Sequence, residues 1–381
     1  MKRPNPFLYL PLGFLVKIFA IIKGQRIMVK SIIKRPAIIL SNHTSFYDFI
    51  YTTAAMYPAR VNYLGAKKYF HDPLTAIFMK IDRAIPKSLM QVDPKAIRSA
   101  LKLLQNKGIL AIFPEGQISA TGTSLQPAYA IAKLIKKASV NVYIVKHKNA
   151  YFVNPPWSNK TFRGRVETEK KLIIDKDELE VLTNDEVYKV IVDNLFFSSS
   201  NYNKEERYSY KMQNIANLEN MIYQCPDCLH EGLVSSHDRL KCPKCHHELV
   251  YDRFGLLNDT GIDELYSRQE KRFQKIIDDD PQFFLEAVVK LFSFRNNRLV
   301  EVGSGNLRLD PIAYTYHGSI DGEAVIKTFN VSKIPTLPSD IGKNVQIYEN
   351  DQIYQFEFEI PYLTTKFILA GEYLHKKSVH R

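Results

Sequence analysis

The sequence predicts an α/β domain with a mostly parallel sheet and an N-terminal membrane-interface helix, followed by a small zinc ribbon and an antiparallel β domain. Three observations carry this prediction. Strand and helix patterns alternate over the first two hundred residues, which is typical of a parallel sheet covered by helices. All four cysteines fall between residues 225 and 245. Apolar and polar residues alternate one by one near residue 355, which is typical of an antiparallel strand.

The length and composition limit the class of protein. At 381 residues the chain has room for two or three domains. Hydrophobic residues make up 45% and charged residues 24%, which is ordinary for a globular protein and excludes a wholly disordered chain. We expect a membrane-associated α/β domain over residues 1–215 and a zinc ribbon over 220–258. A helical linker plus a small antiparallel β domain should fill 260–381, with a pleckstrin-homology-like fold as one option.

The N-terminal segment Phe7–Ile22 is apolar and lies among basic residues. At 16 residues, interrupted by Pro11 and Gly13, it is short of the roughly 20 that span a bilayer. No small-residue cleavage site of a signal peptide follows it. The first 47 residues hold eight Lys or Arg and no Asp or Glu. We therefore expect a helix in the interface of an anionic membrane, attached peripherally or monotopically at its cytoplasmic face. A buried core helix is the alternative.

The α/β prediction rests on short apolar runs separated by helical patterns. Strands are expected at residues 37–40, 109–113, 140–145 and 171–174. Helices are expected at residues 46–57, from Pro94 onward, at 128–137 and at 185–197. Asp93 is the predicted N-cap before Pro94, and Ile97, Leu101 and Leu104 recur at helical spacing. The charged stretch from residue 198 to about 220 looks like a linker.

The loop after the first predicted strand of the sheet holds a histidine and a carboxylate at close spacing. Ligands bind at the carboxyl ends of strands in α/β sheets, and His43 lies there. Asp48 follows five residues later and could accept the Nδ1–H of the imidazole, leaving Nε2 to take a proton from a substrate hydroxyl. Ser45 and Asp48 also fit a capping box, in which His43 is an ordinary loop residue.

A second block distinguishes these two interpretations. The stretch 113–116, Phe-Pro-Glu-Gly, follows another buried strand at its carboxyl end. The chain here resembles the glycerophospholipid acyltransferase family, whose best-known members acylate 1-acylglycerol 3-phosphate. The family's first motif, N-H-x-S-x-x-D, is matched by Asn42, His43, Ser45 and Asp48, and F-P-E-G lies about 70 residues later, as in the family. The resemblance covers roughly residues 30–194.

The resemblance implies a mechanism and a set of site residues. His43 would be the general base and Asp48 would orient it, while the acceptor hydroxyl attacks the thioester of acyl-CoA or acyl carrier protein without an acyl-enzyme. The implied substrate-binding residues are Arg83, Phe113, Glu115 and Gly116. Of these, Arg83 and the Glu115–Gly116 loop would position the phosphate of the acceptor, by charge and by backbone N–H groups. The family usually continues with Thr-Arg, where this chain has Gln117 and Ile118. The acceptor head group, the acyl chain length and the type of donor therefore stay open, as does the oligomeric state.

The cysteines predict a metal site. Two Cys-x-x-Cys pairs, thirteen residues apart, are formed by Cys225 with Cys228 and by Cys242 with Cys245. This spacing is typical of a structural Zn²⁺ closed by four thiolates, with no open position for catalysis. Two disulfides are the weaker alternative, because nothing else in the sequence indicates secretion. We interpret the neighbouring His246 and His247 as bystanders.

The last part of the chain predicts antiparallel strands of unstated function. A helix is expected over residues 262–277, a hairpin turn at Asp321–Gly322, and another across Asn350–Asp351. The alternating residues are Tyr354, Phe356, Phe358 and Ile360, with Val345 and Ile347 as pairing partners.

A competing hypothesis is a scaffold protein with a degraded catalytic domain and a zinc ribbon that binds protein or nucleic acid. The ribbon between Cys225 and Cys245 has no net charge, and it lacks interleaved aromatic residues, so nucleic acid is not the expected partner. The expected partners are membrane lipids and an acyl donor.

Overall fold

The computed structural model divides the chain into two compact units. It describes all residues except 71–72, 89–92, 213, 296–297, 350–351 and 380–381. The first unit consists of Met1–Pro156, Lys160–Lys211 and Arg253–Gly255, and the second of Trp157–Asn159, Met212–Asp252 and Leu256–Arg381. The cysteine stretch and the C-terminal strands thus belong to one unit. The division into domains at 1–215, 220–258 and 260–381 stays a prediction.

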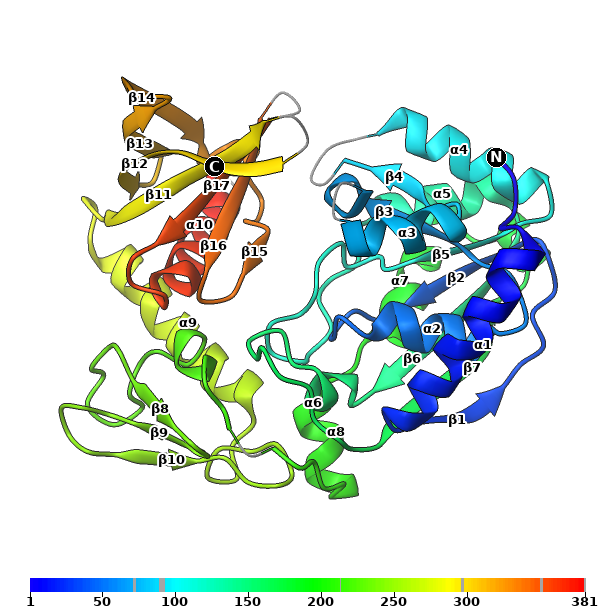
Figure 1. Cartoon of the computed structure of the whole chain (residues 1–381), viewed down its shortest axis with the longest axis horizontal. Helices are drawn as coiled ribbons and strands as arrows, with labels where there is room; N and C mark the ends of the chain where they lie inside the picture. The colour runs from blue at the N-terminus through cyan, green and yellow to red at the C-terminus, as the bar shows by residue number, and fades with distance from the viewer. Residues whose placement is uncertain (71–72, 89–92, 213, 296–297, 350–351, 380–381) are drawn as a thin grey trace. The chain divides into compact units, whose positions relative to one another are not determined.

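The first unit is built on a seven-stranded sheet in the order β1-β7-β6-β2-β5-β3-β4 (Figure 1). The strands are β1 Gln25–Lys30, β2 Ala37–Ser41, β3 Asn62–Ala66, β4 Ile85–Lys87, β5 Ile109–Ile112, β6 Asn141–Lys148 and β7 Val166–Ile174. Strands β6, β2, β5, β3 and β4 run parallel to one another, while β7 is antiparallel to β6 and parallel to β1. The predicted mostly parallel sheet is confirmed.

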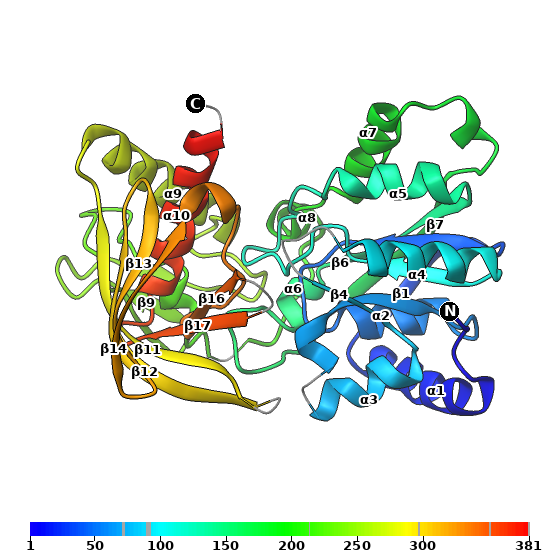
Figure 2. The same cartoon turned by 90° about the horizontal axis from the view of Figure 1, so that it is seen from above.

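Helices cover both faces of this sheet, as Figure 2 shows. They are α1 Pro6–Ile22, α2 Asp48–Met56, α3 Pro73–Ile81, α4 Pro94–Gln105, α5 Ala130–Ala138, α6 Ala150–Val153, α7 Asn184–Leu195 and α8 Ser199–Glu206. Alternate strand residues point to opposite faces. Ile38 and Leu40 pack with α4, α5 and α7, whereas Ala37 and Ile39 pack with α2 on the other face. The strands are therefore buried on both sides, as their continuous apolar runs predict.

Two details of this unit go beyond the prediction, and the second corrects it. Helix α4 begins as expected, with the Asp93 carboxylate accepting from Ala96 N–H at 3.0 Å, but its buried face holds Ala96, Ala100, Leu103 and Leu104. Ile97, one of the residues at helical spacing, is exposed. The predicted linker after residue 197 contains helix α8, whose N-cap is the Ser198 side chain.

The second unit holds a small ribbon and a large antiparallel sheet. The ribbon pairs β8 Val234–Ser236, β9 Arg239–Lys241 and β10 Glu248–Val250. The large sheet has the order β14-β13-β12-β11-β17-β16-β15. Consecutive strands pair except β14 and β15, which form the two edges, and the first strand, β11, pairs with the last, β17. Its strands are β11 Leu285–Arg295, β12 Arg298–Leu309, β13 Ala313–Ile320, β14 Glu323–Asn330, β15 Ser339–Asp340, β16 Asn344–Glu349 and β17 Gln352–Phe358. The separate antiparallel sheet is confirmed, and its pleckstrin-homology-like fold stays a prediction.

Two helices complete the core of the second unit. Helix α9 Ile262–Asp279 was expected, whereas α10 Leu363–Val379 was not. Their buried side chains, among them Phe273 and Phe367, pack with the inner face of the large sheet. Asp321 and Gly322 both have positive φ in the turn between β13 and β14, and Val345 pairs with Phe356, as expected. The expected turn at Asn350–Asp351 lies outside the described residues.

Candidate functional site

The loop that follows β2 is fixed by the side chain of Asn42. Its amide donates to the carbonyl of His147 at 3.0 Å and accepts from His147 N–H at 2.8 Å. The side chain thus replaces one backbone pair where β2 leaves β6. The next residue, His43, begins its loop from a defined position at the carboxyl edge of the sheet.

His43 and Asp48 form a hydrogen-bonded pair. The Nδ1 of His43 lies 3.1 Å from Oδ2 of Asp48, and the same oxygen accepts from the N–H groups of Thr44 (2.6 Å) and Ser45 (2.8 Å). Asp48 is fully buried, whereas His43 exposes 19% of its side chain. A carboxylate oxygen can only accept hydrogen bonds, so it orients the imidazole with Nδ1 as donor. In the neutral ring Nε2 is then the atom that can accept a proton.

The capping alternative is also present, in a modified form. Helix α2 begins at Asp48, and Tyr47 is its N-cap without a side-chain capping bond. Ser45 Oγ accepts from Tyr47 N–H at 3.1 Å, and Asp48 accepts from Ser45 N–H. Asp48 therefore orders the first turn and contacts the imidazole at once, so the two sequence-based interpretations do not exclude each other.

The aromatic ring of Phe113 stacks on the imidazole. The ring centroids of His43 and Phe113 lie 4.4 Å apart at an interplanar angle of 26°, and Tyr63 stacks on Phe113 in turn at 6.4 Å. Phe113 was predicted to bind substrate. In the structure its ring contacts His43 and limits the rotation of the imidazole.

Glu115 binds the main chain of the His43 loop. Its Oε1 accepts from His43 N–H at 2.9 Å and its Oε2 from Leu125 N–H at 2.8 Å. The carbonyl of His43 accepts from Ser119 N–H at 2.8 Å, so both backbone groups of His43 are held by the segment after β5. Burial raises the pKa of Glu115 to about 8. The carboxylate was predicted to bind substrate, but both of its oxygens contact backbone.

Gly116 makes the turn after β5 possible. Its φ is +77°, which favours glycine, and its N–H donates to the carbonyl of Phe113 at 3.1 Å. The N–H expected to bind phosphate is therefore already used within the turn.

The structure does not bring Arg83 to His43. Strand β4 is parallel to β3, β3 to β5, and β5 to β2, so Arg83, two residues before β4, lies at the amino edge of the sheet. His43 lies at the carboxyl edge. The reason is local: α3 continues to Ile81, and β4 begins only at Ile85. The last residue of β4 is Lys87, which occupies the edge where Arg83 was expected.

The Acyltransferase family model matches residues 22–147, a range that includes the His43 loop and the turn at 113–116.

This part of the chain is therefore similar to acyltransferases.

Two relatives illustrate the likeness. Over 100 residues the chain is 27% identical to the 1-acyl-sn-glycerol-3-phosphate acyltransferase of Bacillus subtilis (strain 168), a match that covers 26% of this chain and 50% of the relative. The chain thus spans about half the length of that curated relative. The crystal structure of the 1-acyl-sn-glycerophosphate (LPA) acyltransferase, PlsC, from Thermotoga maritima aligns with a TM-score of 0.43 at 18% identity. That alignment covers 50% of this chain and 76% of the other.

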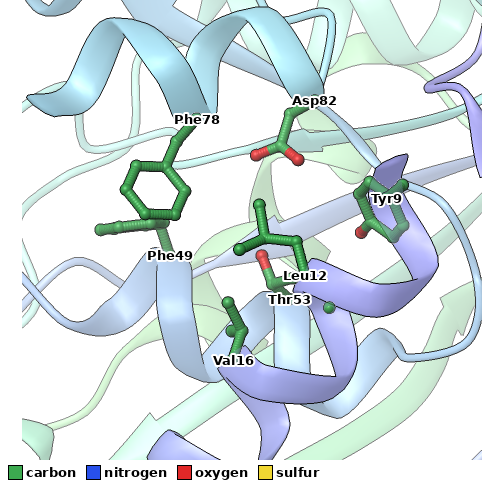
Figure 3. A pocket seen from close by; sticks show the side chains of 8 residues that line it. Tyr9, Leu12, Val16, Phe49, Thr53, Phe78 and Asp82 are labelled. Atoms are coloured by element: carbon green, nitrogen blue, oxygen red, sulfur yellow. The ribbon is translucent and has the colours of Figure 1, made fainter. Parts of the chain in front are cut away.

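The first unit has a small pocket beside α2, which Figure 3 shows. Its lining comes from α1, α2, α3 and the residue that follows α3, and consists of Tyr9, Leu12, Gly13, Val16, Phe49, Thr53, Phe78 and Asp82. The enclosed space of about 10 Å³ holds roughly one water molecule. Asp82 is 6% exposed, and burial raises its pKa to about 7. Nothing in the sequence pattern indicated that this carboxyl faces a pocket.

The outer face of α1 is strongly apolar. The helix begins with the Asn5 side chain accepting from Phe7 N–H at 3.0 Å, and it buries Tyr9, Gly13 and Ala20. Its exposed apolar residues are Phe7, Leu8, Phe14, Leu15, Ile18, Phe19, Ile21 and Ile22. No helix in the described part of the chain combines the length and apolar character needed to cross a bilayer.

The four cysteines of the second unit form a compact cluster. Their sulfur atoms all lie within 4.8 Å of one another, and the pairs Cys225–Cys245 and Cys228–Cys242 are 3.6 Å apart. A disulfide has a sulfur separation near 2 Å, so none is present. Tetrahedral Zn–S bonds of about 2.3 Å place sulfurs roughly 3.8 Å apart, which fits these distances. The cluster can hold a metal ion.

Both cysteine turns have the same backbone form. Leu229 N–H donates to the Cys225 carbonyl and His246 N–H to the Cys242 carbonyl, and Leu229 and His246 both have φ near +60°. His247 pairs with the Asp227 carboxylate at 3.0 Å. The two histidines therefore shape the turns beside the cluster and are not members of it.

Proposed function

We propose that this protein is a lysophospholipid acyltransferase that moves an acyl group from acyl-CoA or acyl carrier protein to the hydroxyl of 1-acylglycerol 3-phosphate. One observation carries the proposal: within an acyltransferase domain, a partly exposed His43 donates from Nδ1 to a buried Asp48 and keeps Nε2 for a proton. The name of the Bacillus subtilis relative, a 1-acyl-sn-glycerol-3-phosphate acyltransferase, supports the choice of acceptor.

The proposed step balances without an acyl-enzyme. Nε2 of His43 removes the proton of the acceptor hydroxyl as its oxygen attacks the thioester carbonyl. The carbon–sulfur bond then breaks, and the leaving thiolate takes the proton from the imidazolium. Asp48 stabilises the imidazolium, because its Oδ2 lies 3.1 Å from Nδ1.

For the acceptor phosphate we propose Lys87 in place of Arg83. Lys87 ends β4 at the carboxyl edge of the sheet, and its Nζ donates to the Ser88 carbonyl at 3.1 Å. Its partial burial lowers its pKa, which an anionic ligand would reverse. The other candidate cation, Lys146, donates to the Phe196 carbonyl at 3.2 Å.

We further propose a membrane role for α1 and a structural Zn²⁺ for the cysteine cluster. The exposed apolar residues of α1 and the basic residues around it suit peripheral binding to an anionic bilayer. Cys225, Cys228, Cys242 and Cys245 would hold the metal, which would link the two cysteine turns and leave no position for substrate.

The test is acyl transfer to lysophosphatidic acid in mixed micelles, with acyl-CoA and acyl carrier protein as separate donors. His43→Ala should abolish product formation, whereas His317→Ala, an exposed histidine of the other unit, should not change it. Transfer by the wild type that persists in His43→Ala contradicts the role of His43. If the wild type is silent on lysophosphatidic acid, other lysolipids follow, and silence on all of them with both donors overturns the proposed function.

A further inference from the structure

A second histidine lies fully buried below the catalytic loop. His147 belongs to β6, and both ring nitrogens have threonine partners: Nε2 lies 2.8 Å from Thr52 Oγ1 and Nδ1 lies 3.0 Å from Thr168 Oγ1. A histidine between two lysines at the end of β6 gave no indication of this in the sequence. The proposed reaction does not use it.

The direction of these hydrogen bonds can be worked out from one end. Ser41 Oγ donates its single proton to the Val145 carbonyl at 2.6 Å. The Thr52 hydroxyl must therefore be the donor in its 3.2 Å bond to Ser41 Oγ. Since Thr52 has spent its proton, its oxygen accepts from His147, and the imidazole carries a proton on Nε2.

The hydrogen bonds at the other end of this series, around Gln25 and Thr168, agree with this assignment. Gln25 Nε2 donates to Thr168 Oγ1 at 2.8 Å and to the Tyr51 carbonyl at 2.8 Å. The Thr168 hydroxyl is then free to donate to Nδ1 of a neutral imidazole. In a protonated ring Nδ1 would itself be a donor, so the Thr168 hydroxyl would lose this acceptor. Complete burial lowers the pKa of His147 to about 4. All five side chains between Gln25 and Ser41 in this series are buried.

This series, which we name the Gln25–Ser41 chain (Gln25, Thr168, His147, Thr52, Ser41), joins five elements. It connects β1, β7, β6, α2 and β2 at the base of the loop that holds His43. Thr52 lies one helical turn after Asp48, and the main chain of His147 pairs with the side chain of Asn42, the residue before His43. The helix that carries Asp48 and the residue before His43 therefore both contact His147.

We propose that His147 is a positioning residue that, as a neutral Nε2–H imidazole, fixes α2 and β2 relative to each other and so sets the His43–Asp48 geometry. This inference rests on the proposed acyl transfer. A fully satisfied buried network of this kind rigidifies its surroundings, and a displacement near 1 Å in a catalytic pair costs about a hundredfold in rate.

The first test reads the tautomer without any activity. In full-length protein labelled with ¹⁵N-histidine, His147 should give the NMR signature of a neutral ring protonated at Nε2, and it should not titrate between pH 5.5 and 8. Thr168→Val should leave Nδ1 unprotonated but lose its bond. A proton found on Nδ1, or titration near pH 6.5, contradicts the assignment of His147 as a neutral ring protonated at Nε2.

The second test separates positioning from folding. His147→Gln, which offers a donor and an acceptor, should keep kcat within about threefold, whereas His147→Leu should lower it 10- to 100-fold at an unchanged KM. Thr52→Val should behave like His147→Leu. Thr53→Val is the matched control. It removes a buried hydroxyl of the same helix that bonds to Tyr63 and is no member of the Gln25–Ser41 chain, so this variant should retain kcat.

Equal kcat values in Thr52→Val and Thr53→Val contradict the proposal even if His147→Leu does not fold. If the wild type transfers acyl groups to no acceptor, the proposed function has failed and the positioning role falls with it. The NMR result then still reports on the chain itself, so the two failures can be told apart.

Discussion

Asp48 and Glu115 both contact His43, but through different parts of it. Asp48 accepts from the imidazole, whereas Glu115 accepts from the main-chain N–H. Asp48 alone is placed to compensate a charge that develops on the ring. Glu115 instead holds the loop against the segment after β5, with a pKa raised to about 8 by burial.

Conservative substitutions should separate these two roles. Asp48→Asn keeps an oxygen for the N–H donors but removes the charge, so we expect kcat to fall about a hundredfold or more with little loss of stability. Glu115→Gln turns an NH₂ group toward a backbone N–H. In this variant we therefore expect the unfolding free energy to fall by about 1–3 kcal/mol in addition to a loss of kcat. Steady-state kinetics and urea unfolding measure both, with exposed Glu180→Gln as control. A stable but inactive Glu115→Gln would contradict the assignment to the main chain.

His147 should make stability depend on acid pH. Its pKa of about 4 lies below the ordinary value of 6.5, so the unfolded chain binds a proton at a pH where the native chain does not. The associated stability is complete above pH 6.5 and is lost as the pH falls toward 4, by about 3 kcal/mol. Urea unfolding between pH 4 and 7 should show this loss in the wild type and a shallower one in His147→Gln. Parallel curves would refute it.

At the scale of elements, the sequence predicted the features that depend on interactions between residues close together in the chain. The strands after 37 and 109, the start of α4 and the His43–Asp48 pair follow from spacing over a few residues, and all are found. Arg83 and the contacts of Glu115 depend on how distant segments meet, which spacing does not encode. Helix α10 was missed because Thr364, Thr365 and Gly371 weaken its helical pattern. Gly371 lies where a side chain would collide with the Tyr314 hydroxyl, so packing on the sheet decides that helix.

Helix α1 is the element whose outer face should bind lipid. Leu15 and Ile22 are 61% and 67% exposed, so replacing both by Ser removes apolar area without disturbing the buried Tyr9 and Gly13. Loss of two such contacts should weaken binding to anionic vesicles by about 3 kcal/mol, roughly a hundredfold in partition. Co-sedimentation measures it, and Val181→Ser, a similarly exposed apolar residue, is the control. Unchanged binding of the double variant would leave α1 without a membrane role.

At the scale of the whole molecule, contacts with helices α9 and α10 of the same unit stabilise the cysteine ribbon. Gln269 of α9 donates to the Met221 carbonyl at 2.6 Å, Lys366 of α10 pairs with Glu231 at 2.8 Å, and Tyr223 stacks on Tyr362 at 5.5 Å. The ribbon has few apolar residues of its own, so a bound metal should supply much of its order.

Metal removal should therefore loosen one unit and spare the other. In the full chain, a strong chelator should raise hydrogen exchange in residues 221–250 and in α9, while the sheet that carries His43 stays protected. Elemental analysis should find one zinc per chain, and adding Zn²⁺ back should restore protection. Equal loosening of both units, or none, would contradict a structural metal confined to the second.

The contacts that aim His43 all come from the protein's own chain. Asp48, Phe113, Glu115 and Ser119 hold its ring and both of its backbone groups before any lipid is bound. Such a site is preorganised, and a substrate has no ordering of the base left to do. Acceptors that share the reacting hydroxyl but differ in head group should consequently be distinguished mainly by how tightly they bind, with similar turnover once bound.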